Sequence, residues 1–317
     1  MPNPRATLAA TILGSSLAFI DGSVVNVALP ALAHDLRVAP AHLSWTINAY
    51  LLPLGALILL GGALGDHFGR RRCFQFGLTT FTFASMVCAA APSLAWLVAA
   101  RGLQGLGAAL LVPNSLAILG GAFTGEARGR AIGTWAAVGA LAGAVGPIVG
   151  GWIVDTVGWR TIFLLNLPMA AGAGYLAWKY VAEQKELHRA APLDAMGAGL
   201  ATIALGLLTW ALTKASESSG GYSTSWAAAV AGCLLLGAFL RHEGKLGSRA
   251  IMPLAMFAER TFVGFMLLTF FLYGSLGGLL VLLPFFLIKI EGWLAIAGKA
   301  GAALAAPAVP AVVASIA

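Results

Sequence analysis

The chain alternates between long apolar runs and short polar segments that are rich in charge, glycine and proline. Most of the runs are near the roughly 20 residues that a helix needs to cross a bilayer. They lack the two-residue alternation that is typical of membrane β-barrel strands. The pattern therefore predicts ten membrane-spanning helices, at residues 7–29, 43–64, 73–91, 94–121, 131–154, 161–181, 193–213, 226–240, 261–288 and 293–317.

Turn-forming and capping residues mark several boundaries of these runs. Pro30 and Pro92 lie in the first and third links, and a serine- and glycine-rich segment at 216–225 follows the seventh run. Asp194 stands where the N-cap of the seventh helix is expected. The first run continues past Asp21 without a clean small-residue cleavage site, which favours an uncleaved span over a signal peptide.

Positive charge is divided unevenly between the two sets of loops. Thirteen lysines and arginines fall on the side of the N-terminus and four on the other side, while Arg101 and Lys299 lie inside apolar runs. Because cytoplasmic loops carry an excess of Lys and Arg, this distribution predicts a plasma-membrane protein with a cytoplasmic N-terminus. The net charge of +7 is spread between apolar runs rather than along one stripe, which argues against nucleic-acid binding.

Composition excludes the other broad classes. Of 317 residues, 59% are hydrophobic and 10% charged, whereas about 25% of a soluble domain is charged. Cys73, Cys88 and Cys233 form no CxxC pair and the five histidines are scattered, so neither a disulfide framework nor a metal site is predicted. The chain has no catalytic or nucleotide-binding motif of a common class. We therefore expect neither an enzyme nor a cofactor.

Short motifs give the polytopic pattern a more specific interpretation. They are FIDGSVVNVALP at 19–30, GALGDHFGRRR at 62–72, RGLQGLGAA at 101–109, GPIVGG at 146–151 and WRTIFLLNLP at 159–168. The first and third place Asp21 and Arg101 inside spans, where a charge is costly and usually functional. Together the motifs resemble the major facilitator superfamily, and specifically its fourteen-span drug–proton antiporter branch. The chain departs from that pattern at His67, where a more basic residue is usual, and at Ala142, where glycine is expected.

The resemblance implies an all-α integral membrane protein, folded as a major-facilitator-type helical bundle with inverted three-helix repeats. It divides the chain into an N-terminal six-helix transport half at 1–182, a cytoplasmic loop with two linking helices at 183–245, and the start of a C-terminal half at 246–317. Because the branch has fourteen spans, the C-terminal half is expected to be incomplete and the chain truncated.

The function implied by the resemblance is secondary active transport. The protein would export amphipathic or cationic organic compounds, including drugs, in exchange for protons by alternating access. Its expected partners are a small organic substrate, protons and the lipid bilayer, and no residue pattern identifies a periplasmic adaptor. The alternative is a non-transporting remnant or partial subunit of such a transporter. An importer of the same fold is disfavoured by the GPIVGG pattern.

Asp21 is the only acidic residue deep inside a predicted span, so it is the candidate for proton coupling. Asn26, Arg101 and Gln104 are the other candidate cavity residues. Asp21 and Arg101 both lie roughly 12–13 Å below the outer boundary at 1.5 Å per residue. We therefore expect these two charges to face each other. The alternative is that Arg101 bonds backbone carbonyls while Asp21 packs alone.

Two further groups of residues follow from the motifs. The resemblance implies a cytoplasmic gate that latches the two halves in one state, although simple positive-inside anchoring would also explain its arginines. Its residues are Gly62, Asp66, Gly69, Arg70, Arg71 and Glu126. The resemblance also implies an antiporter hinge packed against the second half, with generic packing of small residues as the alternative. Its residues are Gly139, Gly143, Gly146, Pro147, Gly150 and Gly151. We expect a bulky residue at Gly146 or Gly150 to be more damaging than one at Gly77.

Overall fold

Helices account for all the regular secondary structure that the structure describes. The computed structural model describes residues 3–39, 42–183, 194–216, 222–247, 250, 252–272 and 274–275. The α-helices are α1 (Pro4–Leu36), α2 (Ser44–Phe68), α3 (Arg70–Ala89), α4 (Leu94–Ala122), α5 (Gly125–Thr156), α6 (Arg160–Leu164), α7 (Asn166–Tyr180), α8 (Ala195–Ser216) and α9 (Tyr222–Leu246). A 3-10 helix, Leu254–Ala258, and a further helix, Arg260–Leu272, follow.

The described helices overlap the predicted spans, but α1 continues through Pro30, which the sequence placed in the first link, and ends at Leu36. Within the described residues, seven helices are long and apolar enough to cross a membrane, and they match the first, second and fourth to eighth predicted spans. The third predicted span forms α3, whose sequence begins with three arginines and is too polar to join those seven. The ninth span begins at Arg260, while its second part and the whole tenth span lie outside the described residues.

The sixth span is interrupted where the sequence predicts one continuous helix. Its two parts, α6 and α7, meet at Leu165, and the break comes just before Pro168. Because proline has no backbone N–H, it cannot donate to the carbonyl of Leu164 one turn earlier. The break places Asn166 at the first position of α7, on a buried face.

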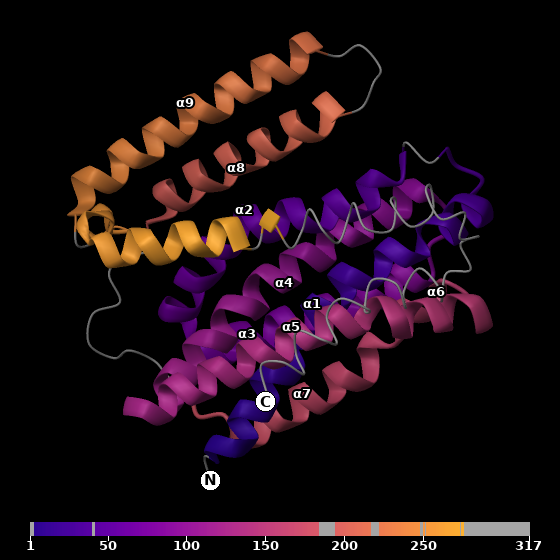
Figure 1. Ribbon diagram of the computed structural model, residues 1–317, viewed down its shortest axis with the longest axis horizontal. Helices are drawn as coiled ribbons and strands as arrows, with labels where there is room; N and C mark the ends of the chain where they lie inside the picture. The colour runs from indigo at the N-terminus through magenta and orange to yellow at the C-terminus, as the bar shows by residue number, and fades with distance from the viewer. Residues whose placement is uncertain are drawn as a thin grey trace.

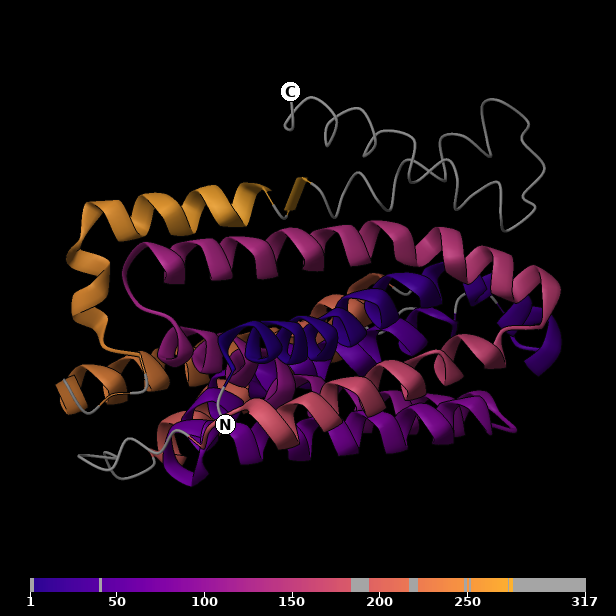
Figure 2. The ribbon, with the colours of Figure 1, turned by 90° about the horizontal axis from the view of Figure 1, so that it is seen from below.

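The first seven helices form one bundle, with α1 and α4 as its most buried long members. The α4 helix packs against α2 and α3, while α1 packs against α5 and α7. Figure 2 shows α5 running along one side of the bundle. The α8–α9 hairpin lies at the edge beside α2 (Figure 1), where the Thr202 hydroxyl donates to the carbonyl of Ala56 at 3.0 Å.

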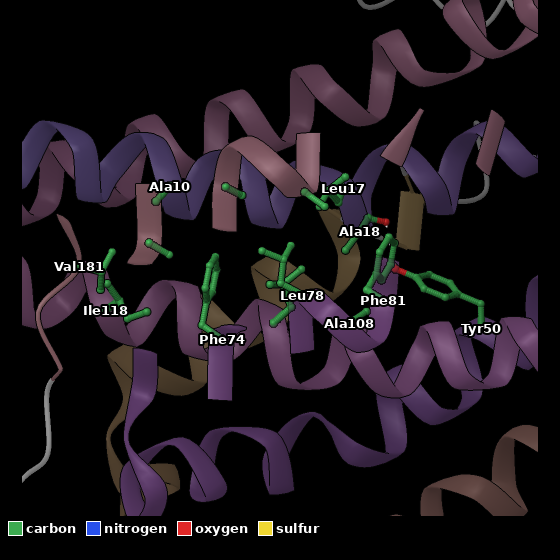
Figure 3. Close-up of a cluster of buried hydrophobic side chains, with 14 residues drawn as sticks. Ala10, Leu17, Ala18, Tyr50, Phe74, Leu78, Phe81, Ala108, Ile118 and Val181 are labelled. Carbon is green, nitrogen blue, oxygen red and sulfur yellow. Dashed lines mark hydrogen bonds between the residues drawn. The ribbon is translucent and has the colours of Figure 1, made fainter. Parts of the chain in front are cut away.

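Two apolar clusters fill the interior of the bundle. The first joins residues of α1 to α4 and α7, including Leu17, Phe74 and Phe81 (Figure 3). The second lies further along α1 and includes Val24 and Phe163. On α1 the two clusters are separated by about one helical turn, and the polar residues described next lie in this interval.

Candidate functional site

Asp21 and Arg101 form an ion pair in the interior of the bundle. Asp21 lies near the middle of α1 and Arg101 in α4, and each is only 1% exposed. Nη1 of Arg101 donates to Oδ2 of Asp21, so the predicted pairing is confirmed. Nε of Arg101 also donates to the carbonyl of Thr46 at 3.0 Å. The guanidinium therefore bonds both the carboxylate and a backbone carbonyl, which the sequence treated as alternatives.

Two amide side chains complete the environment of the carboxylate. Gln104 and Asn166 donate to Oδ1 of Asp21 at 2.8 and 3.1 Å, and both also donate to the hydroxyl of Ser85, at 2.9 and 3.1 Å. Arg101 in turn donates to the side-chain oxygen of Gln104 at 2.7 Å. The network therefore draws side chains from α1, α3, α4 and α7, and it ties these four helices together at one depth.

Aromatic rings enclose the guanidinium on its remaining sides. Cζ of Arg101 lies 4.3 Å from the centroid of the Tyr50 ring and 6.0 Å from that of Phe163. The Tyr50 hydroxyl donates to the carbonyl of Ala18 at 3.1 Å, which holds the ring in place (Figure 3). The rings replace water around a buried charge and stabilise it through the electron density on their faces.

The chemistry of this cluster is that of a stabilised carboxylate. Ionised Asp21 accepts bonds from a guanidinium and two amides, the pattern by which a protein holds a buried negative charge. Protonation of Asp21 would remove the charge that neutralises Arg101 and would force the network to rearrange. The described residues include no group of three His, Cys, Asp or Glu side chains that could hold a metal ion.

The site differs from the predicted set in one member and in several additions. Asn26 is exposed and donates to the carbonyls of Gly22 and Ser23 at 3.2 and 3.3 Å, so it does not contact the cluster. Sequence reasoning missed Asn166 and Ser85. The signal for Asn166 was present, because it is a polar residue inside an apolar run and within a quoted motif.

The gate motif surrounds the turn between α2 and α3. Arg70 forms an ion pair with Asp66 at 3.0 Å and donates to the carbonyl of Ala117 at 3.3 Å. Arg71 donates to the carbonyl of Trp178 at 2.6 Å. The arginines thus connect this turn to α4 and α7 within the same bundle.

Glycine and glutamate residues complete the description of this region. Gly69 joins the two helices with φ of 108°, a conformation that side chains disfavour, and Glu183 lies against it and 3.6 Å from Arg72. Gly62 makes only ordinary contact, because a Cβ there would lie 3.8 Å from Pro113. Glu126 is exposed and pairs with Arg130 of its own helix at 4.0 Å. Among the described residues, the acidic side chain that joins Asp66 at the arginine run is therefore Glu183, not Glu126.

The hinge residues face two directions. Close contacts with α1 involve Gly139, whose Cβ would lie 2.8 Å from the Phe19 ring, and also Gly146 and Gly150, which face Ser23 and Val24. Pro147 and Gly151 are buried too. A Cβ at Gly143, by contrast, would meet no described atom within 4 Å. Gly139 and Gly143, which are four residues apart, therefore do not share one packed face.

The packing gives Gly77 a close contact too, which the expected contrast with Gly146 and Gly150 did not include. A Cβ on Gly77 would lie 2.8 Å from the carbonyl oxygen of Gly107 and 2.9 Å from both Cβ of Leu110 and the backbone nitrogen of Leu111. The α3 and α4 backbones therefore approach each other as closely as α5 approaches α1. A single glycine, without a second one four residues away, is therefore sufficient for a close contact between these two helices.

Apolar helices of membrane-spanning length around a buried charged network are the architecture of a multi-pass membrane protein. Comparison with known families agrees, because residues 11–317 match the model of the Major Facilitator Superfamily. The chain belongs to this family.

The chain is also similar to individual proteins. The multidrug resistance protein Stp of Mycobacterium tuberculosis is 36% identical over 292 residues, which cover 90% of this chain and 53% of Stp. The methylenomycin A resistance protein of Bacillus subtilis is 34% identical over 270 residues, or 83% of this chain and 57% of that protein. A bacterial homologue of the human lysosomal transporter Spinster superposes with a TM-score of 0.49 at 17% identity, over 96% of this chain and 74% of that one. The chain spans about half the length of the curated relatives it matches.

Proposed function

We propose that the protein exports amphipathic or cationic organic compounds, including drugs, in exchange for protons. The observation that carries the proposal is the buried Asp21–Arg101 pair inside a bundle of this family. Support for the substrate class comes from relatives whose names describe multidrug and methylenomycin A resistance. Transport would proceed by alternating access, which exposes the cavity to one side of the membrane at a time.

In this proposal Asp21 carries the coupled proton. An ionised carboxylate at this depth is stable only while donors surround it. Proton binding would release Arg101, and the two amides of Gln104 and Asn166 would have to find new acceptors. The reverse step, return to the ion pair, would expel the proton. A cationic substrate would also favour release of the proton, because it would compete with the proton for the carboxylate.

The topology and the two motif regions are part of the same proposal. We place the N-terminus in the cytoplasm of a plasma-membrane protein, on the basis of the loop charges. We also propose three parts of the chain: a transport half at 1–182, a linking segment at 183–245 and the start of a second half at 246–317. The turn at Gly69 would act as the cytoplasmic gate, and α5 as the hinge toward the second half.

The test uses purified protein in proteoliposomes with an imposed pH gradient. We expect drug movement driven by the gradient, and we expect its loss in Asp21→Asn. The control is Asp35→Asn, which neutralises a half-exposed carboxylate on the same helix that pairs with Arg160 at 2.5 Å. Full coupled transport by Asp21→Asn would exclude the coupling role. Absence of transport by correctly folded wild-type protein would favour a partial subunit instead.

A further inference from the structure

A second group of titratable side chains lies outside the transport bundle, in the α8–α9 hairpin. The start of α8 and the end of α9 lie together (Figure 1), and Asp194, His242 and Glu243 meet there. Glu243 is fully buried, and the Asp194 side chain is only 5% exposed. Nothing in the proposed transport mechanism uses these residues.

Each acid has one oxygen in a well-defined bond. Oδ1 of Asp194 caps α8 by accepting from the backbone N–H of Gly197 at 2.8 Å, as the sequence predicted, and lies 2.9 Å from Nε2 of His242. Oε2 of Glu243 accepts from the backbone N–H of Met252 at 2.6 Å. Asp194 thus links α8 to α9, while Glu243 links α9 to the segment that leads to the Arg260–Leu272 helix.

The other oxygen of each acid is buried without a hydrogen-bond donor among the described residues. These atoms are Oδ2 of Asp194 and Oε1 of Glu243. They converge above Gly197, where a Cβ would lie 2.7 Å from Oε1 of Glu243 and would also collide with Oδ2 of Asp194. The two carboxyl groups lie within hydrogen-bonding reach of each other.

Two ionised carboxylates in this arrangement are unfavourable. Both oxygens can only accept, and two negative charges at such a distance repel strongly when water is excluded. One proton removes both problems, because it turns one acceptor into a donor and cancels one charge. We propose that Asp194 and Glu243 bind a single shared proton, which holds the Met252 segment against the α8–α9 hairpin.

The partners of Asp194 indicate which acid is protonated. Burial raises the pKa of Asp194, but the Gly197 amide and His242 outweigh burial and hold this pKa below its ordinary value. Asp194 therefore remains the charged partner of His242, and the proton resides on Glu243. The arrangement is then a neutral acid beside a carboxylate that contacts the His242 ring.

The other described charged groups near this end of the hairpin are exposed. Arg241 and Lys245 on α9 are exposed, as are Asp66 and His67 at the end of α2, which packs against α8. Among the described residues, the titratable groups that act on the two acids are each other and His242. A metal ion is a poorer occupant than a proton, because the described residues offer no group of three ligands that could hold one.

The proton gives the hairpin a pH-dependent attachment. With the proton bound, Glu243 holds the amide of Met252 and its other oxygen donates to Asp194. When the proton is lost at high pH, like charges separate the acids, and the Met252 amide loses its acceptor. This site is distinct from Asp21 and does not depend on transport.

The test measures the proton directly. Infrared spectra of the wild-type chain in lipid nanodiscs near neutral pH are compared with those of Glu243→Gln, which is neutral and of similar size. We expect the variant to lose the C=O band of one carboxylic acid. The control, Glu126→Gln, neutralises an exposed acid and should leave that band intact. An unchanged band in Glu243→Gln would overturn the proposal.

A second measurement needs no variant. Hydrogen exchange of the Met252 amide in the wild type, corrected for the intrinsic pH dependence, should lose its protection as the pH rises through the ionisation of the pair. Protection that is independent of pH would contradict the proposal. Protection and spectra that respond to Na⁺ or Mg²⁺ at constant pH, rather than to protons, would replace the proton by a bound cation and would also overturn it.

Discussion

The guanidinium of Arg101 lies over the ring of Tyr50, with 4.3 Å between its Cζ atom and the ring centroid. This contact joins α4 to α2, while the ion pair with Asp21 joins α4 to α1. Arg101 is therefore held by an opposite charge, an aromatic face and the Thr46 carbonyl at once. Each of these contacts offsets part of the cost of burying a cation in a membrane protein.

The contribution of the Tyr50 ring can be separated from that of its hydroxyl. Tyr50→Phe keeps the ring over Arg101 and loses only the bond to Ala18, which should cost about 1 kcal/mol. Tyr50→Leu removes the ring as well, and should cost about 2 kcal/mol more because the cation is desolvated. Thermal unfolding in detergent measures both. Equal stability of the two variants would show that the ring does not stabilise Arg101.

Removing one charge of the ion pair should reduce stability more than removing both. Asp21→Asn leaves Arg101 buried without its counter-charge, and we expect a loss of about 3–5 kcal/mol in stability. Adding Arg101→Met replaces the unpaired cation by an apolar side chain, so the double variant should be more stable than Asp21→Asn alone. Unfolding of the four proteins of the cycle measures the coupling. Additive losses would show that the two charges do not act as a pair.

The depth of a side chain along its helix can be predicted from the sequence. The direction in which the side chain points can be predicted only in part. Gln104 follows Arg101 by three residues, which returns it to within about 60° of the same face. Asn26 follows Asp21 by five residues, which turns it by about 140° and away from the carboxylate. Asn166 could not be placed from sequence, because its orientation depends on the break before Pro168.

Glycine spacing likewise indicates that one face of a helix is packed closely, but it does not indicate which helix packs there. The glycine pairs in α5 indicated that some face is packed closely. A Cβ at Gly143 would nevertheless meet no described atom within 4 Å, while one at Gly146 would collide with α1. Gly77 has no such pair and is packed against the α4 backbone. The partner helix determines which glycine is essential, and a single sequence does not specify that partner.

Leucine substitutions should therefore separate glycines that share a spacing. Gly146→Leu and Gly77→Leu place a side chain against another helix, and each should reduce the yield of folded protein. Gly143→Leu is the matched control on α5, because its position is open. Size-exclusion chromatography in detergent measures the folded fraction. A loss at Gly143 as large as that at Gly146 would show that spacing, rather than contact, sets the tolerance.

The last prediction concerns the turn at Gly69, where conformation and contact act together. Gly69→Ala forces a Cβ into a φ of 108° and against the carboxylate of Glu183, which should cost about 1–3 kcal/mol. Gly62→Ala is the control, since its nearest neighbour would lie at 3.8 Å.

Removing the Glu183 side chain separates the two causes. If the backbone conformation dominates, Glu183→Ala will not restore the stability of Gly69→Ala. If the contact dominates, the double variant will recover most of the loss. Thermal unfolding distinguishes the two results. We expect little recovery, because the end of a flexible glutamate side chain can move away whereas the φ of the turn is fixed by the two helices it joins. Equal stability of Gly69→Ala and Gly62→Ala would contradict both explanations.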